Sequence, residues 1–110
     1  DCLKKIAAAM KESAKRSGDF VGRFGGEEFV AILPGLEIEE AAAWAETLRA
    51  AVERARIPHE DSHTGCVTVS IGLVSLSPDK AGNMLELIRL ADEALYRAKA
   101  NGRNRVEFFT

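Results

Sequence analysis

The sequence predicts an α+β domain in which helices pack on a central sheet that contains an antiparallel strand pair. Segments rich in β-branched and aromatic residues alternate with segments of helical periodicity, in the order α-ββ-α-β-α-β. A glycine pair, Gly25 and Gly26, separates the two adjacent strand segments and is typical of a tight hairpin turn. The hairpin argues against a purely parallel doubly wound sheet, and a length of 110 residues fits one domain.

The first half of the chain predicts a helix followed by the hairpin. Apolar residues recur at helical spacing over residues 2–15, and a Ser-Gly-Asp sequence ends that helix. Residues 20–24 and 27–34 are the two strands of the hairpin. The glycine pair joins them as a two-residue turn, because glycine supplies the positive φ angles that such turns need. We therefore expect Glu27 at or beside the tip of the hairpin.

The second half predicts two long helices and two further strands. Residues 37–56 and 84–101 each carry an apolar stripe at helical spacing, and Gly102 occupies the position of a C-terminal cap. Residues 66–76 are rich in β-branched side chains and predict a strand, and residues 105–109 predict the last one. The polar segments expected to be loops are 57–65 and 77–83.

Composition and charge exclude several classes. The net charge of −2 gives no broad basic surface, so no nucleic acid polymer is expected as a partner. The apolar runs are too short to span a bilayer and no signal peptide is visible, so we expect a cytoplasmic location. Cys2 and Cys66 are interpreted as reduced thiols, with a single disulfide left open. The chain opens inside a helical pattern without an initiator Met, so we expect a piece of a longer protein, one that upstream segments could anchor to a membrane.

The hairpin carries the first candidate site. Glycines at a turn let a ligand such as a phosphate group approach the backbone closely at Gly25 and Gly26. Glu27 and Glu28 offer hard oxygen ligands of the kind that magnesium takes alongside substrate phosphates. Successive strand residues face opposite sides, so only one of the two glutamates is expected to face the ligand. The alternative is a plain hairpin whose exposed edge is protected by charge.

Cations at the end of the last helix form the second candidate. Lys99 and Arg103 lie in the last helical turn and just beyond the cap, where both can reach the same side and hold a triphosphate. The alternative is that the helix dipole alone favours cations there.

Two further pairs carry weaker signals. Arg16 and Asp19 suit a guanine edge, although on local grounds a helix end followed by a turn acid is the better explanation. His59 and His63, four residues apart in a polar loop, are interpreted as solvated side chains rather than metal ligands.

Taken together, these segments resemble the GGDEF domain family, the diguanylate cyclases. The signature is "RFGGEEF", Arg23 to Phe29, and "RSGD" upstream of it is similar to the family's inhibitory product-binding site. "VTVSIGLV" is similar to its next central strand, and "ADEALYRAKANGRNRV" to its closing helix and turn. The resemblance implies a nucleotidyl-cyclase or ferredoxin-like fold and covers nearly the whole chain.

The resemblance implies an enzyme that condenses two GTP molecules into cyclic di-GMP and pyrophosphate, with one GTP held by each half of a homodimer. Glu27 would ligate Mg²⁺ or Mn²⁺ and assist deprotonation of the attacking hydroxyl, with Glu28 as the neighbouring catalytic acid. Gly25 and Gly26 would let the nucleotide lie over the turn. Lys99 and Arg103 would hold its phosphates.

The resemblance also implies regulation. Arg16 and Asp19 would bind the product cyclic di-GMP at an inhibitory RxxD site. Thr47 stands where an arginine often completes that site, with Arg49 nearby. The family usually carries an upstream sensor or receiver domain, which we expect in the parent protein.

Residues 1–110 depart from the family pattern at the start. The first strand with its aspartate metal ligand, and the following guanine-reading segment, do not occur, and Asp1 does not replace the guanine reader. We therefore expect a partial GGDEF domain with a gap in its sheet, inactive alone. The alternative functions are a non-catalytic cyclic di-GMP sensor that binds through Arg16 and Asp19, or a non-catalytic interaction domain.

Overall fold

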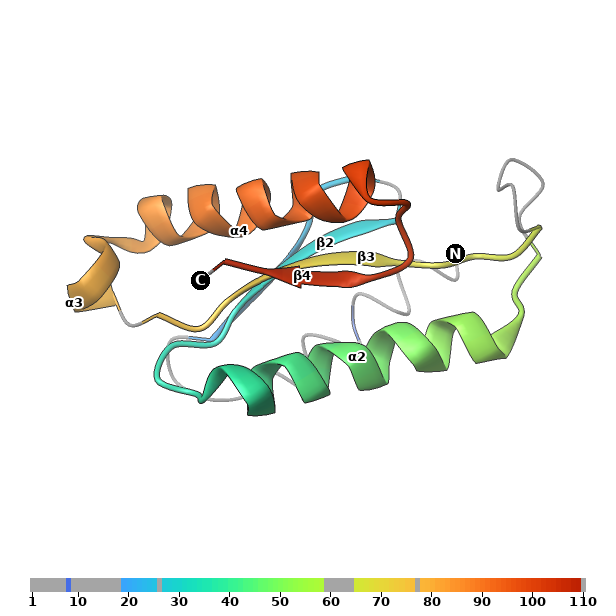
Figure 1. Cartoon of the computed structure of the whole chain (residues 1–110), viewed down its shortest axis with the longest axis horizontal. Helices are drawn as coiled ribbons and strands as arrows, with labels where there is room; N and C mark the ends of the chain where they lie inside the picture. Colours follow the sequence, from blue (N-terminus) through green and yellow to red (C-terminus); the bar gives the residue numbers. More distant parts are fainter. Residues whose placement is uncertain (1–7, 9–18, 26, 59–64, 77, 110) are drawn as a thin grey trace.

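The computed structural model describes residues 8, 19–25, 27–58, 65–76 and 78–109, and it confirms an α+β fold with a mixed sheet. Four strands form one sheet, and two long helices lie along it (Figure 1). The predicted helix over residues 2–15 falls almost wholly outside the described residues. In chain order the elements are β1 (Phe20–Arg23), β2 (Glu28–Ile32), α2 (Ile38–Ala55), β3 (Ser70–Val74), α3 (Pro78–Ala81), α4 (Met84–Ala100) and β4 (Val106–Phe108).

The sheet is continuous in the order β1-β2-β3-β4. β1 pairs with β2 antiparallel, as the hairpin predicts, whereas β2–β3 and β3–β4 are parallel. The expected gap in the sheet is therefore wrong. β2 and β3 pair directly, in a register that runs from Glu28 opposite Ser70 to Ile32 opposite Val74. Each strand thereby provides hydrogen-bond partners for the backbone groups of the other.

The two long helices cover opposite faces of the sheet, with α4 above it and α2 below it in Figure 1. Successive residues of a strand face opposite sides of the sheet, so β2 contributes to both cores. Phe29 and Ala31 pack in the core beneath α2, whereas Val30 and Ile32 pack in the core beneath α4. All five residues of β3 are buried, which explains why its sequence is a continuous apolar run. The predicted helices 37–56 and 84–101 are thus confirmed as the two packing layers.

Gly72 lets α4 lie very close to the sheet. A Cβ atom on Gly72 would collide with the carbonyl oxygen of Ala91 and the amide nitrogen of Leu95 in the backbone of α4. Only a residue without a side chain fits there. This close packing fixes the height of α4 above β3, and therefore the position of the cations at its end.

Both ends of α4 are capped. The side chain of Asn83 accepts a hydrogen bond from the amide of Glu86 at 2.9 Å. At the other end Gly102 has φ of 119°, its amide donates to Lys99, and the amide of Arg103 donates to the carbonyl of Ala98 at 2.8 Å. This is a Schellman motif, and it confirms Gly102 as the cap glycine.

Two local predictions are wrong. Residues 78–81 form the short helix α3 inside the segment expected to be a loop, because Pro78 starts a helical turn readily. The strand expected over 66–76 is regular only over Ser70–Val74, since before it only an isolated bridge joins Cys66 to Pro58. Among the helices within the described ranges, none combines the length and the apolar character that a membrane span requires.

Candidate functional site

The connection between β1 and β2 is longer than the two-residue turn that the glycine pair predicts. Strand β1 ends at Arg23 and β2 begins at Glu28, so residues 24–27 form the turn. The amides of Phe24 and Gly25 both donate to the carbonyl of Glu28, at 2.7 and 3.4 Å. Both amides thus close the turn on one acceptor, and Glu27 lies in the turn rather than in the strand.

Gly25 lies against the side chain of Glu28. A Cβ atom at Gly25 would collide with the Glu28 carboxylate, so the glycine allows that carboxylate to fold back over the turn. Gly26 lies outside the described residues. The glycine predicted to admit a phosphate group therefore admits an acidic side chain in this structure.

Glu28 is the centre of an ion-pair cluster. Its carboxylate lies 3.5 Å from Nζ of Lys99 and 4.0 Å from a terminal nitrogen of Arg103. The Glu28 side chain is 26% exposed, that of Lys99 34% and that of Arg103 56%, so the cluster is partly buried and open to solvent at Arg103. The start of β2 and the end of α4 thus bring together three of the residues that the sequence singles out.

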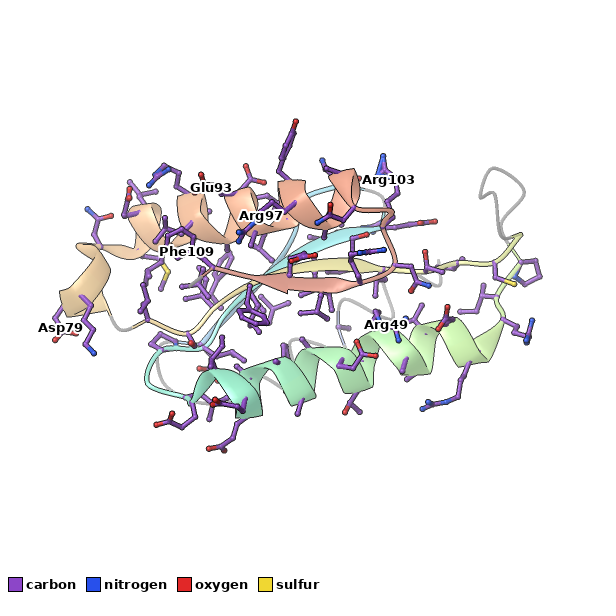
Figure 2. All side chains as sticks on the ribbon, in the orientation of Figure 1. Arg49, Asp79, Glu93, Arg97, Arg103 and Phe109 are labelled. Carbon is purple, nitrogen blue, oxygen red and sulfur yellow. The ribbon has the colours of Figure 1, made fainter. Side chains whose placement is uncertain are left out.

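The backbone after α4 positions Arg103. The Schellman motif turns the chain back, and Arg103 and the following Asn104 both adopt left-handed conformations, with φ of 62° and 50°. Figure 2 shows Arg103 at the end of α4, above the edge of the sheet. The turn holds both cations at one end of the sheet, as the sequence predicts.

Glu27 is half-buried, although the hairpin tip was expected to face solvent. Its carbonyl accepts a hydrogen bond from the amide of Ser70 at 3.0 Å, which ties the turn to β3. No group of three or more His, Cys, Asp or Glu side chains within the described ranges forms a ready metal site. One carboxylate with nucleotide phosphates is nevertheless a ligand set that Mg²⁺ accepts, so Glu27 fits a metal held jointly with a substrate.

A second polar cluster joins α2 to the loop after α4. Arg49 donates two hydrogen bonds to Glu46, one to Glu53 at 3.1 Å, and one to the side-chain oxygen of Asn104 at 2.8 Å. The side-chain nitrogen of Asn104 in turn donates to Glu53 at 2.6 Å, and the backbone amide of Asn104 donates to the hydroxyl of Ser70 at 3.1 Å.

The charges of this cluster stabilise one another. Hydrogen bonds from Arg49 hold the pKa of Glu46 below its ordinary value. Asn104 and Arg49 do the same for the pKa of Glu53. The pKa of Arg49 is raised, chiefly by its hydrogen bonds to Glu46. Sequence reasoning missed the cluster, and its only local signal was an Asn in a turn that needs positive φ.

The product-site residues are described only in part. Arg16 lies outside the described residues, and Asp19 is half-buried immediately before β1, at the opposite end of that strand from the glycine turn. The hydroxyl of Thr47 donates to the carbonyl of Ala43 within α2. Thr47 therefore offers no cation, and the nearby Arg49 is engaged by α2 and Asn104.

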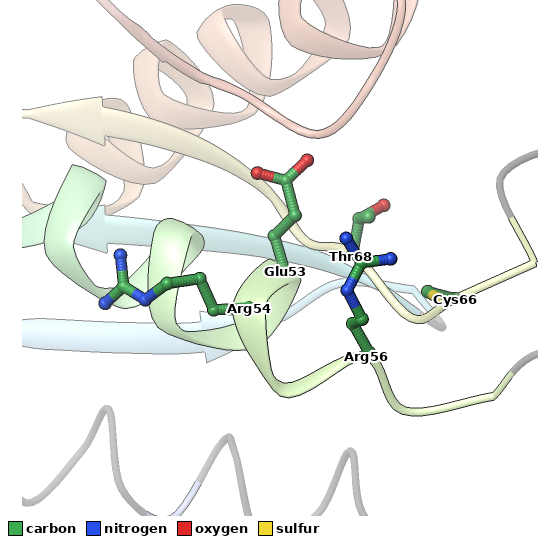
Figure 3. A pocket seen from close by; sticks show the side chains of 5 residues that line it. All are labelled: Glu53, Arg54, Arg56, Cys66 and Thr68. Atoms are coloured by element: carbon green, nitrogen blue, oxygen red, sulfur yellow. The ribbon is translucent and has the colours of Figure 1, made fainter.

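A surface pocket of about 410 Å³ opens beside the end of α2. Its lining includes Arg56, the half-buried thiol of Cys66 and Thr68. In Figure 3, Arg56 reaches toward Thr68 while Arg54 points away. The other predicted loop and thiol residues lie outside the described ranges: Cys2, His59 and His63.

Comparisons with a family model and with known sequences both find similarity to diguanylate cyclases. The family described as "Diguanylate cyclase, GGDEF domain" matches residues 1–105. The chain is 38% identical to diguanylate cyclase DgcP of Pseudomonas aeruginosa over 107 residues, covering 97% of this chain and 16% of DgcP. It is 44% identical to diguanylate cyclase DgcM of Escherichia coli K12 over 95 residues, covering 86% of this chain and 22% of DgcM. The chain thus spans a quarter or less of the length of these relatives.

The fold is similar to that of a solved domain. The crystal structure of the GGDEF domain of DgcB from Caulobacter crescentus, in complex with c-di-GMP, matches with a TM-score of 0.68 and 26% identity. The match covers 97% of this chain and 63% of the DgcB chain.

Proposed function

The chain belongs to the GGDEF domain family of diguanylate cyclases, and from that premise we propose that it is part of an enzyme that makes cyclic di-GMP. Two GTP molecules would be condensed, each 3′-hydroxyl attacking the α-phosphate of the other nucleotide. Each GTP would lose pyrophosphate. The observation that carries the proposal is the anion-binding arrangement of Lys99 and Arg103 around the Glu28 carboxylate.

Lys99 and Arg103 would bind the nucleotide phosphates. Two cations that bracket a carboxylate at 3.5 and 4.0 Å have the spacing to hold other anionic oxygens, and the cluster is open to solvent on one side. Arg offers a planar fork and Lys a flexible point charge, so the pair suits a polyphosphate chain. Glu28 would keep both cations extended toward the turn when no nucleotide is present.

Glu27 would hold a divalent cation together with the phosphates. Glu27 lies in the turn immediately before the start of β2, and so at the same end of the sheet as the two cations. When bound, Mg²⁺ or Mn²⁺ would neutralise charge on the phosphates and favour ionisation of the attacking hydroxyl. Gly25 and Gly26 would leave room for the nucleotide above the turn.

Assembly and regulation follow from the same proposal. Catalysis would need a homodimer, since each domain holds one GTP. We expect residues 1–110 to be inactive alone, and an upstream sensor or receiver domain would control them in the cytoplasm. Arg16 and Asp19 would bind the product at an inhibitory RxxD site.

A second candidate is a cyclic di-GMP sensor without turnover, which would bind through Arg16 and Asp19. The structural neighbour from Caulobacter crescentus was solved in complex with c-di-GMP, which favours a binding role in this fold. An intact "GGEEF" signature favours the enzyme instead.

One experiment separates the two candidates. The full-length protein is incubated with GTP and Mg²⁺, and nucleotides are resolved by chromatography. Formation of cyclic di-GMP supports the enzyme, with ATP as the control substrate. Tight binding of cyclic di-GMP without turnover supports the sensor and rejects the cyclase.

A further inference from the structure

The loop that carries Arg103 is strained. Arg103 and Asn104 both have positive φ, and neither is glycine. A left-handed conformation is energetically unfavourable at a non-glycine residue and persists only where the surroundings hold it. Asn tolerates this region better than most residues, whereas Arg does not. The amide of Arg103 is held by its bond to the carbonyl of Ala98, and a second anchor outside the loop holds the residue that follows.

Asn104 provides that anchor through three contacts with two other elements. Its backbone amide donates to Ser70 at the start of β3, and its side chain donates to Glu53 and accepts from Arg49 on α2. The nitrogen and the oxygen of its single side-chain amide are thus each satisfied by a charged partner, Glu53 and Arg49 respectively. Both partners lie more than one element away in the chain.

The anchor is itself rigid. Arg49 is only 14% exposed, and it is fixed by hydrogen bonds to Glu46 at 2.6 and 2.8 Å. Ser70 is buried, and its amide donates to the carbonyl of Glu27. The same β3 residue therefore contacts the backbone of the glycine turn and the loop after α4. In Figure 2, Arg49 lies on the side of α2 that faces the sheet.

We propose that Asn104 is a positioning residue, which Arg49 and Glu53 lock so that Arg103 is presented to the nucleotide phosphates. The inference rests on the proposed function, because it assigns Arg103 to phosphate binding. Asn104 touches neither substrate nor metal in this scheme. It acts by fixing the backbone on which Arg103 stands, and it relates the packing of α2 to the placement of that cation.

The test uses Asn104→Gly in the full-length protein. Glycine keeps the left-handed backbone and the amide bond to Ser70, so only the side-chain link to α2 is lost. A second variant, Asn104→Asp, places a second carboxylate beside that of Glu53 and replaces the hydrogen bond with repulsion. The double variant Glu53→Gln with Asn104→Asp restores the hydrogen bond with donor and acceptor exchanged. Asn101→Ala is the matched control, since Asn101 donates to Glu107 rather than to α2.

Steady-state kinetics provide the first readout. We expect Asn104→Gly to raise the KM for GTP about tenfold with a much smaller change in kcat, because charged hydrogen bonds depend on placement. The double variant should bring the KM for GTP most of the way back to the wild-type value. The KM of Asn101→Ala should remain near that of wild type. A purely structural role would lower the active fraction, and so kcat, at unchanged KM. That pattern, or a wild-type KM in Asn104→Gly, would overturn the proposal.

Hydrogen exchange of residues 99–106 without nucleotide provides the second readout. Faster exchange in Asn104→Gly, reversed in the double variant, supports the anchor. If hydrogen exchange is unchanged in Asn104→Gly, Asn104 does not anchor the loop, whatever the kinetics show. If the wild-type protein makes no cyclic di-GMP, the proposed function fails. The exchange result, together with binding of GTP relative to GMP, then still decides whether Asn104 positions a phosphate-binding arginine.

Discussion

The Glu28 carboxylate lies 3.5 Å from Nζ of Lys99, so the first residue of β2 and the last turn of α4 are joined by charge. Neither element would place these groups together alone. The contact depends on the close packing of α4 over Gly72 and on the turn that follows Arg23. This contact directs Lys99 and Arg103 toward the glycine turn, where an anionic ligand would contact both side chains.

Replacing either cation should weaken GTP binding selectively. We expect Lys99→Ala and Arg103→Ala each to raise the KM for GTP about tenfold or more in the full-length protein, since charged hydrogen bonds to phosphate are strong. Lys80→Ala on α3 is the control. Steady-state turnover across a range of GTP concentrations measures the effect. A KM equal to that of wild type in both variants would remove these residues from phosphate binding.

Glu27→Gln should abolish cyclic di-GMP synthesis and leave the fold intact. Gln keeps the shape of the side chain but loses the charge that holds a hard cation. Because Glu27 is half-buried, we expect the free energy of unfolding to change by about 1 kcal/mol at most. Turnover with GTP and Mg²⁺, measured beside the melting temperature, provides the check.

Glu28→Gln is the comparison for that variant, because its carboxylate pairs with Lys99 and Arg103. It should keep more turnover than Glu27→Gln. A folded Glu27→Gln protein that works at the wild-type rate would show that Glu27 has no role in metal binding.

The elements could be predicted from the sequence because periodicity and turn residues are local signals. The hairpin and both long helices follow from such patterns, and their ends agree with the structure within a few residues. The direct pairing of β2 with β3 was not predictable, since strand order depends on contacts between distant segments. The length of the turn was missed because a glycine pair permits a two-residue turn without requiring one.

The candidate site was predictable only as a set of residue types. Lys99 and Arg103 were placed on one side of a helix end, and the structure brings them to Glu28. That Glu28 rather than Glu27 meets them depends on where the strand begins. Arg49 reads in sequence as an ordinary helix-surface arginine with acids nearby, and nothing local reveals its bond to Asn104.

Gly72→Ala should destabilise the domain strongly. The added methyl group would meet the backbone of α4 at Ala91 and Leu95, which cannot move without separating the helix from β3. We expect a loss of about 1–3 kcal/mol, as for other overpacked cores. Urea denaturation followed by circular dichroism measures it. Gly22→Ala is the matched control, since a methyl group there meets mainly the rings of Phe20 and Phe24, which can rotate away. Equal losses in both variants would contradict the close-packing argument.

Arg16→Ala should weaken cyclic di-GMP binding and relieve product inhibition while leaving turnover in place. Asp19 lies at the end of β1 away from the glycine turn. The five residues between Asp19 and Gly25 would span about 16 Å when extended, so an inhibitory site at Asp19 would be separate from the phosphate-binding end. Because Thr47 stands where an arginine often completes the family's site, binding should be weaker than in relatives that have both arginines. Titration calorimetry decides the matter, and an affinity unaffected by the substitution would rule out an inhibitory site at Arg16.

Lowering the pH should weaken the hydrogen bonds among Arg49, Glu53 and Asn104 that join α2 to the loop after α4. The pKa values of Glu46 and Glu53 are lowered from 4.5 by hydrogen bonds from Arg49 and Asn104. A carboxyl group whose pKa is lower in the folded state stabilises the fold above its ordinary pKa and loses that contribution as pH falls through the lowered value.

Arg49→Met tests this directly, because it removes the donor and keeps the length of the side chain. We expect the variant to melt below wild type at pH 7, with the difference shrinking from about pH 5 downward as the wild-type carboxylates take up protons. Arg89→Met is the control. It breaks the pair with Glu86, in which Arg89 is 61% exposed against 14% for Arg49, so the smaller effect should also fade in salt. A difference in melting temperature between Arg49→Met and wild type that stays constant from pH 7 to pH 3 would show that Arg49 contributes packing rather than charge.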